Sequence, residues 1–437
     1  MTKLRTHRLF SLLPAHSRNA SSLEKLSLPA MICIVVLFCA AAGIAAPAQR
    51  SFTTLVNFNG ANGGAPSAAL IQATDGNFYG TTSGAGPDGN GEVFKMTPSG
   101  TLTTLFAFDA SDGYNVSAGL VQGTDGNFYG ITTQGGAYSN GTVFKITPTG
   151  TLTTLYNFCP QDGCTDGAYP YGALVQGSDG NFYGAAGGGA NYCGLDQCGV
   201  VYKITSDGTY TTVHSFDGSD GDGPNALVQA SDGNFYGTTS AAGAYGNGTV
   251  FKMTPAGVVT TLYSFCSQEN CADGSGPVAA LVQATDGNFY GTTYGGGGSP
   301  AYCSNGQSGC GTVFKITPAG VYTKLHGFCI SGPPCTDGHG LLAGLVQAAD
   351  GNFYGAASNG GGSHGDGSGT VFEITPAGAL TTLHVFDYSD GYIVAAGLVQ
   401  GTDGNLYGTT FQGGAYGYGT VFRVGNVVVA PCARCSP

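Results

Sequence analysis

A six-residue word recurs seven times along the chain and sets the spacing of everything around it. Asp-Gly-Asn-Phe-Tyr-Gly, or the same word with Leu in place of Phe, begins at Asp75, Asp125, Asp179, Asp232, Asp286, Asp350 and Asp403. The intervals between successive copies are 50, 54, 53, 54, 64 and 53 residues. Periods of this length, in a chain rich in Thr, Val, Tyr and Phe, are typical of propeller blades or of a solenoid.

Each word lies within a repeat of four short apolar or β-branched runs. In the unit at 118–158, run A is GLVQG (119–123), run B is NFYGITT (127–133), run C is GTVFKIT (141–147) and run D is LTTLYNF (152–158). Asp-Gly between A and B is a hairpin dipeptide, and Thr-Pro-x-Gly between C and D forms a tight corner. Successive hairpins predict a four-stranded antiparallel meander.

The two ends of the array distinguish a ring from a solenoid. Seven A–B–C sets are present, the last at 398–424, and no run D follows it. The missing run D is FTTLVNF at 52–58, before the first run A. A ring explains this split, because the N-terminal strand then completes the last blade and leaves no open sheet edge. We predict an all-β, seven-bladed β-propeller over 49–424, with run D outermost and run A at the axis.

The words DGNFYGTT, GTVFKITP and LTTLYxF also resemble the GloVer-type tandem repeat of secreted, choice-of-anchor bacterial proteins. The resemblance covers essentially the whole chain after residue 48. More loosely, DGN(F/L)Y is similar to the NHL-type propeller repeat. The resemblance implies export and residence outside the cell or at its surface, and it implies no particular activity.

The first 48 residues differ from the repeats. Basic residues precede an apolar run at 31–46, and Ala46-Pro47-Ala48 has the small-x-small form of a cleavage site. This pattern predicts a secretory signal peptide over 1–48, with an uncleaved anchor as the alternative. Residues 425–437 are predicted to be a short tail with no membrane span, and the exported chain is expected to be a monomer.

The charge of the chain after residue 48 is strongly negative. It has 9 Lys and Arg against 25 Asp and Glu, so its net charge is 9 − 25 = −16. Nucleic acid is a poor partner for such a chain, because its binding demands basic surface. Sugars, cations or basic proteins outside the cell are the favoured partners.

Twelve cysteines follow the signal, in close pairs that are typical of disulfides in an oxidising compartment. The pairs are Cys159/Cys164, Cys193/Cys198, Cys266/Cys271, Cys303/Cys310, Cys329/Cys335 and Cys432/Cys435. Cross-pairing of the first two is the alternative connectivity. The last pair alone has the two-residue spacing of a zinc site, and no second such pair accompanies it.

The predicted topology gives the propeller two unlike faces. The A–B and C–D turns share one face, here called the turn face, and the D–A and B–C loops share the other, the loop face. The turn face repeats Asp-Gly-Asn and Pro-x-Gly almost without change, whereas the loop face carries every change of length. Insertions on one face of a repeat array usually mark the binding face.

The D–A loops FDASDG, FDGSDGDG and FDYSDG carry closely spaced carboxylates. Ca²⁺ takes six to eight oxygen ligands, so these loops are candidate calcium sites. The residues are Asp109, Asp112, Asp217, Asp220, Asp222, Asp387 and Asp390. The alternative is that Asp and Gly only form turns here, since no loop has a full EF-hand pattern.

Five tyrosines in the B–C loops are candidate ligand-binding residues: Tyr138, Tyr192, Tyr245, Tyr302 and Tyr416. Their rings could stack on sugars or anchor a protein partner. The alternative is that each ring packs against its own Gly-rich loop. Exposure of the rings would favour binding, and burial would favour packing.

The histidines are the next set of candidates. His339 and His364, with Asp337 and Asp366 nearby, are a weak metal or acid–base candidate. His214, His326 and His384 share one place in run D, where Tyr156 and Tyr263 also stand, and are predicted to be structural.

A glutamine recurs in every run A: Gln72, Gln122, Gln176, Gln229, Gln283, Gln347 and Gln400. Each is predicted to bond the backbone of the neighbouring blade, with a ligand-binding amide ring as the alternative. A basic residue recurs in run C, at Lys95, Lys145, Lys203, Lys252, Lys315 and Arg423, with Glu373 as the exception. These are predicted to pair with the Asp of the A–B turn.

No catalytic residue is predicted. Trp is absent from the chain, which argues against sialidase-type Asp boxes and quinone-docking repeats, and no nucleophile-elbow, zinc-protease or Walker sequence is present. We expect a non-catalytic binding or display module for an extracellular glycan or protein. The alternatives are a secreted glycan hydrolase or lyase using loop carboxylates such as Asp220 and Asp222, and a structural repeat protein of the cell envelope.

Overall fold

The computed structural model describes residues 50–86, 88–194, 196–297, 309–332, 334–362 and 367–426. They belong to one unit, Arg50–Asn426. The predicted signal peptide, Tyr302, Cys303, His364, Asp366, Cys432 and Cys435 lie outside the described residues. The predicted domain limits stay predictions, although the last strand runs two residues beyond 424.

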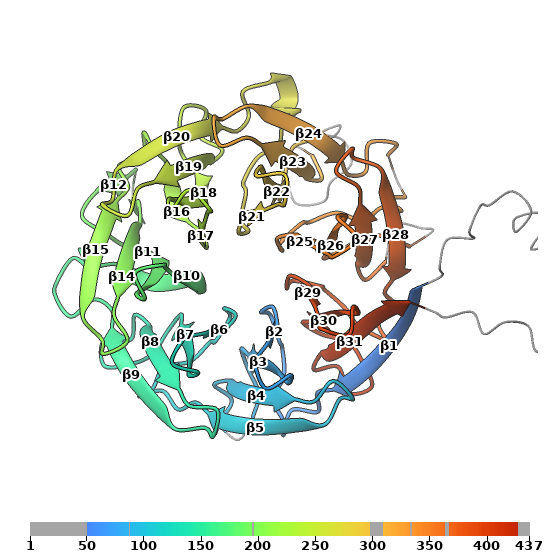
Figure 1. The fold of residues 1–437 in the computed structure, drawn as a ribbon, viewed down its shortest axis with the longest axis horizontal. Coiled ribbons are helices and arrows are strands. Elements are labelled where there is room, and N and C mark those ends of the chain that lie inside the picture. Colours follow the sequence, from blue (N-terminus) through green and yellow to red (C-terminus); the bar gives the residue numbers. More distant parts are fainter. Residues whose placement is uncertain are drawn as a thin grey trace, which may run out of the picture. The chain divides into compact units, whose positions relative to one another are not determined.

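Seven sheets succeed one another around an axis (Figure 1). Blade 1 contains β2 (Ile71–Gln72), β3 (Phe78–Thr82), β4 (Glu92–Met96) and β5 (Leu102–Ala107). Blade 2 contains β6 (Val121–Gln122), β7 (Phe128–Thr132), β8 (Thr142–Ile146) and β9 (Leu152–Asn157). Blade 3 contains β10 (Ala168–Gln176), β11 (Phe182–Gly187), β14 (Val200–Ile204) and β15 (Tyr210–Ser215).

The remaining blades repeat the pattern. Blade 4 contains β17 (Val228–Gln229), β18 (Phe235–Ala241), β19 (Thr249–Met253) and β20 (Val259–Ser264). Blade 5 contains β21 (Val282–Gln283), β22 (Phe289–Thr293), β23 (Thr312–Ile316) and β24 (Tyr322–Gly327). Blade 6 contains β25 (Val346–Gln347), β26 (Phe353–Ala357), β27 (Thr370–Ile374) and β28 (Leu380–Val385). Blade 7 contains β29 (Val399–Gln400), β30 (Leu406–Thr410), β31 (Thr420–Asn426) and β1 (Arg50–Asn57).

The N-terminal strand closes the ring, as the split repeat predicted. β1 pairs antiparallel with β31, so that Phe52 faces Val424 and Thr54 faces Phe422. In Figure 1 the blue first strand and the red last strand lie side by side, with run D at the rim and run A at the axis. The seven-bladed propeller and the orientation of its blades are confirmed.

Blades 3 and 4 depart most from the repeat. β10 is a continuous nine-residue strand where the other blades have two-residue inner strands. Blade 4 gains a fifth strand, β16 (Asp222–Pro224), which pairs with β18 beside β17. The short hairpin of β12 (Tyr192–Cys193) and β13 (Asp196–Gln197) rises from the B–C loop of blade 3, and the 3-10 turn η1 (Glu269–Cys271) follows β20.

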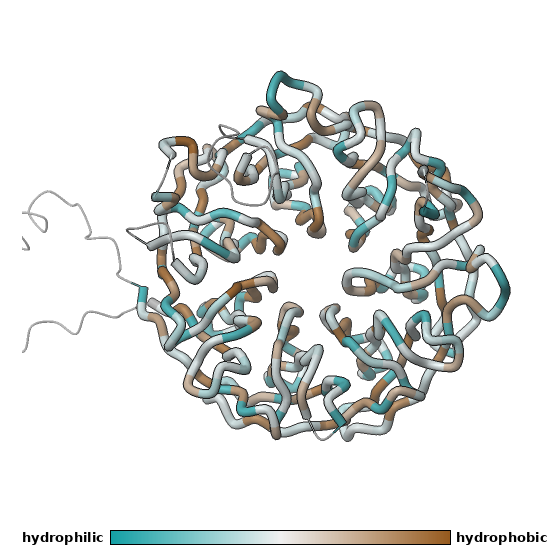
Figure 2. The backbone as a smooth tube through the Cα atoms, turned by 180° about the vertical axis from the view of Figure 1, so that it is seen from behind, coloured by the Kyte–Doolittle hydropathy of each residue, from teal (hydrophilic) through white to brown (hydrophobic). Residues whose placement is uncertain are grey.

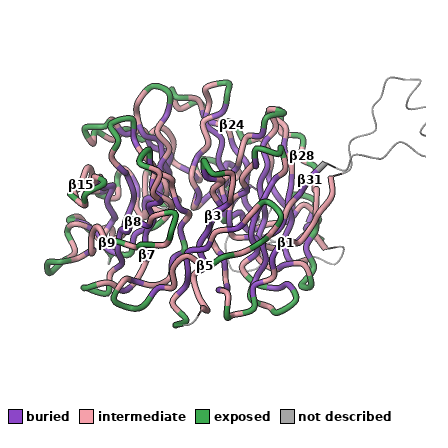
Figure 3. The backbone as a smooth tube through the Cα atoms, turned by 60° about the horizontal axis from the view of Figure 1, so that its bottom comes forward, coloured by how far each residue is buried: buried purple, intermediate pink, exposed green. Residues whose placement is uncertain are grey.

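The hydrophobic core lies between neighbouring blades. One buried cluster joins Tyr79, Val93 and Phe108 of blade 1 to Phe128 and Phe144 of blade 2. Comparable clusters occupy the other seams. Figure 3 accordingly shows buried segments in the interior and exposed loops at the ends of the strands, and the two middle strands of each blade are the buried ones. Because each blade buries its apolar faces only against its neighbours, closure of the ring stabilises every seam.

At the turn face, the residues of the recurring Asp-Gly-Asn-Phe-Tyr-Gly word stabilise these contacts between neighbouring blades. In blade 2 the Asp125 carboxylate accepts bonds from the Asn127 backbone (3.1 Å), the Asn127 amide (2.8 Å) and the Tyr129 hydroxyl (2.8 Å). Gly126, at φ 80°, makes the tight turn between the strands possible. The Tyr129 ring then stacks on Phe182 of blade 3 at 3.9 Å. Asp, Gly, Asn, Phe and Tyr therefore all have structural roles.

The glutamines link each blade to the next, as predicted. The Gln122 Oε1 accepts the Thr74 backbone N–H of the preceding blade at 3.0 Å, and the same bond recurs around the circle. The Thr402 N–H donates to Gln72 Oε1 at 2.7 Å and completes it. The glutamine amides therefore already have hydrogen-bond partners within the fold.

The basic residues of run C pair with the turn aspartates only in part. Lys95, Lys252 and Lys315 bond Asp75, Asp232 and Asp286 at 2.9, 2.9 and 3.2 Å. Lys145 and Lys203 form no such bond, but their positive charges help to lower the pKa of Asp125 and of Asp179.

Blade 6 carries Glu373 in place of the basic residue. There Arg50, from the first residue of β1, approaches Asp350 (3.3 Å) and Glu373 (3.8 Å) and bonds the Tyr354 hydroxyl. A cation from the closing strand therefore replaces the missing lysine.

Candidate functional site

The loop-face tyrosines that the structure describes are exposed. The exposed fractions are 48% for Tyr138, 66% for Tyr192, 55% for Tyr245 and 62% for Tyr416. Burial in their own loops, the alternative considered from the sequence, does not occur for these four rings. They are available to a partner.

Local hydrogen bonds hold the loops that carry these rings. The Asn140 amide donates to the Tyr138 carbonyl at 2.7 Å, and the Asn247 amide donates to the Tyr245 carbonyl at 2.9 Å. The Asn157 side chain of β9 accepts the Ala137 N–H at 2.8 Å. The tyrosines thus project from loops with a fixed backbone, which lowers the entropy lost on binding.

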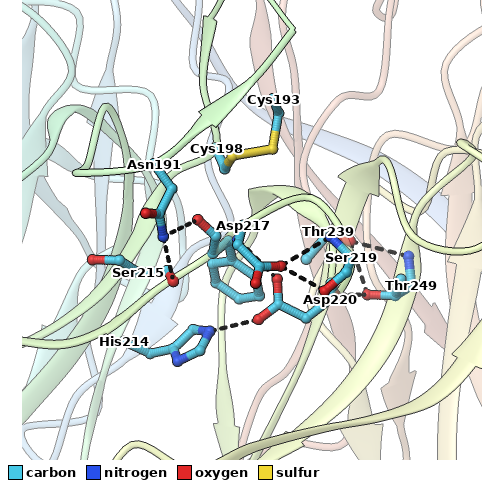
Figure 4. A network of polar contacts seen from close by, with 11 residues as sticks. Asn191, Cys193, Cys198, His214, Ser215, Asp217, Ser219, Asp220, Thr239 and Thr249 are labelled. Atoms are coloured by element: carbon cyan, nitrogen blue, oxygen red, sulfur yellow. Dashed lines mark hydrogen bonds and ion pairs between the residues drawn. A yellow bond between two sulfur atoms is a disulfide. The ribbon is translucent and has the colours of Figure 1, made fainter.

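The acidic D–A loops are compact turns. In blade 3 the Asp217 Oδ1 accepts from the Ser219 N–H (2.9 Å) and hydroxyl (2.6 Å), and Asp220 accepts the Asp217 N–H at 3.0 Å. His214 Nε2 lies 2.7 Å from the other Asp220 oxygen (Figure 4). The hydrogen bonds from Ser219 lower the pKa of Asp217.

The residue at the same place in run D bonds the equivalent aspartate in blades 2, 4, 5 and 6. His326 bonds Asp337 at 3.1 Å and His384 bonds Asp390 at 2.8 Å. Tyr156 and Tyr263 use their hydroxyls on Asp166 and Asp273, both at 2.7 Å. The three run-D histidines are structural, as expected. Asp337 is held by His326 and not by His339, whose pKa is lowered by burial.

The described residues do not bring three of these carboxylates together. Among the described residues, only Cys310, Cys329 and Cys335 bring three candidate ligand atoms within 4.8 Å of one another, and all three are in disulfides. Calcium binding by Asp109, Asp112, Asp217, Asp220, Asp222, Asp387 and Asp390 therefore stays a prediction.

Two of the loop carboxyls are in unusual surroundings. Burial raises the pKa of Asp222 in β16, and the nearby charge of Asp196 adds to the shift. Burial and the charge of Asp109 raise the pKa of Asp112 in the same way. These are the two acids of the predicted set that are held in their protonated forms more readily than ordinary carboxyls.

Four disulfides join neighbours in sequence: Cys159–Cys164, Cys193–Cys198, Cys266–Cys271 and Cys329–Cys335. Cross-pairing of the first two pairs does not occur. Cys310 is also disulfide-bonded. The four bridges with both cysteines described lie in loops of the loop face.

A cavity on the axis was not anticipated from the sequence. It has a volume of about 470 Å³ and is lined by two to four residues of each blade, at the start of run A and directly before it. Most are Ala or Gly, with Ser67, Ser117, Tyr171 and Asn225 as the polar members. Figure 2 shows the hydrophobic inner tips of the blades around this axis. Small residues do not form a recognisable sequence motif. Only the position of these residues, at and before the start of run A, could have indicated the cavity.

The fold and its two faces define a disulfide-bonded, seven-bladed β-propeller with a structural turn face and an exposed loop face. The chain belongs to the Gloeobacter/Verrucomicrobia repeat family, whose repeat matches residues 44–195 and 188–422. No curated protein sequence matches it. None of the described helices is long and apolar enough to span a membrane.

Solved structures share the propeller fold at low sequence identity. Two are extracellular domains from hybrid two-component systems of B. thetaiotaomicron, with TM-scores of 0.51 and 0.52 and identities of 12% and 11%. They cover 88% and 85% of this chain, which spans 42% and 39% of theirs. A 6-phosphogluconolactonase-like structure from Bacteroides uniformis matches at 18% identity over 73% of this chain and 84% of its own, with a TM-score of 0.47. The likeness to the two extracellular domains shows the fold alone.

Proposed function

We propose that this protein is a secreted or cell-surface binding module, without catalysis, that takes an extracellular glycan or protein on its loop face. The observation that carries the proposal is the contrast in side-chain use. On the turn face, the residues of the recurring Asp-Gly-Asn-Phe-Tyr-Gly word form hydrogen bonds within turns and packing contacts between blades. On the loop face, in contrast, four tyrosines keep 48–66% of their surface exposed: Tyr138, Tyr192, Tyr245 and Tyr416.

Several features support a site outside the cell. Four described disulfides are typical of a protein in an oxidising compartment. Family membership and the fold shared with extracellular two-component domains agree with this location. The net charge of −16 after residue 48 (9 − 25) favours neutral or cationic partners over anionic ones.

Replacement of Tyr138, Tyr245 and Tyr416 together by Ala tests the proposal. We expect the wild-type chain to bind members of an array of neutral oligosaccharides and basic proteins, and the triple variant to lose that binding. Val258→Ala with Val321→Ala is the matched control, because these residues are 64% and 63% exposed on the turn face. Equal binding by wild type and the tyrosine variant would contradict the proposal.

Calcium is a separate part of the proposal, supported by the exposed carboxylates of the D–A loops. A melt of the exported chain in EDTA and in millimolar Ca²⁺ tests it. A rise in Tm with Ca²⁺, removed by Asp217→Asn with Asp220→Asn, is the expected result for a metal that binds the folded state. The same Tm in both buffers would leave these loops as turns.

A glycan hydrolase or lyase is the second candidate, and Asp222 is the observation in its favour. A carboxyl with a raised pKa suits a general acid. Asp220, in contrast, is engaged by His214 and by the Asp217 N–H. Release of reducing ends from neutral polysaccharides that disappears in Asp222→Asn would establish this function instead.

A further inference from the structure

From the axial cavity we infer a binding subsite for one or two neutral sugar rings, and this inference rests on the proposed glycan-binding function. None of the residues that line the cavity is charged. Its volume of about 470 Å³ lies within the range of small-molecule sites, about 300–1,000 Å³. A neutral ligand loses no ion-hydration energy on entering such a site.

The cavity has a polar side and an apolar side. Blades 1 to 4 contribute Ser67, Ser117, Tyr171 and Asn225, and blades 5 to 7 contribute chiefly Val278, Leu342, Ala395 and further Ala, Gly and Leu residues. Tyr171 and Leu342 keep 43% and 38% of their surface exposed. A pyranose ring has apolar C–H faces and a hydroxyl edge, so it can satisfy both sides at once.

Unused hydrogen-bonding groups surround the same space. The Ser67 Oγ is buried and makes no hydrogen bond with any described residue. Buried polar atoms in native proteins nearly always have a partner, but this hydroxyl has no accessible surface as placed, so it would meet a ligand in the cavity only after rotation about its Cα–Cβ bond. The Asn225 amide nitrogen, by contrast, is fixed by the Pro277 carbonyl at 2.9 Å.

The backbone around the cavity repeats this pattern in most blades. One residue before the leucine of run A, the peptide N–H and C=O groups form no hydrogen bond with other described residues at Ala69, Gly119, Ala226, Ala280, Gly344 and Gly397. One position earlier, neighbouring blades do bond the carbonyls, as Thr81 does to Ala118 at 3.2 Å. The free groups are donors and acceptors in equal number, which suits sugar hydroxyls because these both donate and accept.

Blade 3 brings the only aromatic ring to this wall among the described residues. Tyr171 lies in the continuous strand β10, at the position where the other blades have Ser, Pro, Val, Leu or Ala. Its phenol lies over Gly187, where a Cβ atom would come within 3.2 Å of the hydroxyl. An aromatic ring at the mouth of a neutral cavity offers a stacking face for a sugar.

Gly397→Leu is the variant that fills the cavity with least harm to the fold. A Cβ atom at Gly397 meets only the Gly344 carbonyl at 3.7 Å and the Ala69 Cβ at 3.8 Å, and its φ is not positive. Gly84→Leu is the matched control, since a Cβ atom there meets nothing within 4 Å and Gly84 lies outside the cavity. Ser67→Ala and Tyr171→Phe remove one hydroxyl each.

Cellobiose, maltose and diacetylchitobiose are the probes, titrated by calorimetry into the exported chain. We expect one of them to bind wild type and Gly84→Leu equally. Gly397→Leu should bind it about tenfold or more weakly, with an unchanged Tm. Ser67→Ala and Tyr171→Phe should weaken binding by smaller factors.

Three results would overturn the inference: no binding of any disaccharide by wild type, equal binding by Gly397→Leu, or competition by peptides and not by sugars. Loss of array binding in the tyrosine variant, with the cavity variants unaffected, would retain the proposed function and reject only the axial subsite. Loss in neither set would reject both.

Discussion

The turn face and the loop face are built from the same repeats but use their polar residues differently. On the turn face, Asp125 is bonded by the following Asn and Tyr, and Gln122 reaches the neighbouring blade. On the loop face, the aspartates close their own turns and Tyr138 projects outward. A position that bonds across a seam is tied to the ring, whereas one that bonds within its loop is free to vary. The variable face is therefore where binding can differ without loss of the fold.

The largest effect is expected where the ring is closed. Deletion of 49–58 leaves β31 with an open edge and removes Phe58, a fully buried ring that packs on Phe94 at 5.5 Å. Loss of a buried Phe alone costs about 3–5 kcal/mol, and the exposed edge promotes association. We expect little monomer by size-exclusion chromatography. Arg50→Ala, which removes only the bridge to blade 6, is the control and should remain monomeric.

A matched pair of Asp→Asn changes compares the two faces directly. Although burial opposes it, hydrogen bonds from Asn288, Tyr290 and Lys315 lower the pKa of Asp286 to about 2. A lowered folded-state pKa stabilises the protein above the unfolded value of about 4, and this stability is lost as the pH falls toward 2.

Asp286→Asn should therefore cost about 1–2 kcal/mol at pH 7, a modest figure because the carboxylate is 41% exposed, and the difference should shrink as the pH falls to 3. Asp109→Asn, on the loop face, should cost less, because the hydrogen bonds from Ser111 that lower the pKa of Asp109 are made to a fully exposed carboxylate. Equal losses at the two sites would remove the distinction between the faces.

Most of the fold could be predicted from the sequence because it is encoded by position within the repeat. The split run D predicted closure by β1, and the recurring Gln predicted the bond to the next blade. The prediction that every run-C lysine bonds the aspartate of its A–B turn was too general, because Lys145 and Lys203 do not form this bond. The role of Arg50 could not be read from the repeat, because it stands outside any run.

The candidate site was less predictable for a physical reason. The sequence left open whether the loop tyrosines are exposed or packed in their Gly-rich loops, and the axial cavity consists of backbone and small side chains. Ala and Gly are equally common in buried turns, so these residue types do not indicate a cavity. The cavity depends on how closely the seven blades approach one another. Glu92 was also missed, since a single acid among five threonines in the equivalent position looks like a variable surface residue.

Glu92 provides a pH test at the loop end of blade 1. It is 1% exposed, and its Oε1 has no partner among the described residues. Burial raises the pKa of Glu92, against the opposing hydrogen bond from Thr104. A raised folded-state pKa means that stability is complete below the unfolded pKa and falls as the pH rises.

Glu92→Gln should therefore melt higher than wild type at pH 8 and equally at pH 4. Glu92→Thr, which restores the residue of most other blades, should behave alike. A lower Tm for both variants at pH 8 would mean that the carboxylate is ionised and bound by a cation.

A smaller effect is expected from an exchange that the repeats already contain. His214 and Tyr156 occupy equivalent places, and both reach the loop aspartate at 2.7 Å. His214→Tyr should therefore change stability by less than about 1 kcal/mol, whereas His214→Ala leaves the Asp220 Oδ2 without its partner and should cost about 1–3 kcal/mol. Equal effects of the two substitutions, measured by urea denaturation, would show that the bond to Asp220 contributes nothing.

The smallest effect on stability should accompany the largest effect on binding. Tyr138, Tyr245 and Tyr416 contribute exposed rings whose loops are held by backbone carbonyls and Asn side chains, so Ala at these positions leaves every loop bond in place. Each replacement should change the free energy of unfolding by no more than about 0.5 kcal/mol, as is usual at exposed positions. A substantial fall in Tm would mean that the rings pack against a neighbouring loop in solution. An unchanged Tm together with lost binding would separate the part of the repeat that forms the ring from the part that meets the partner.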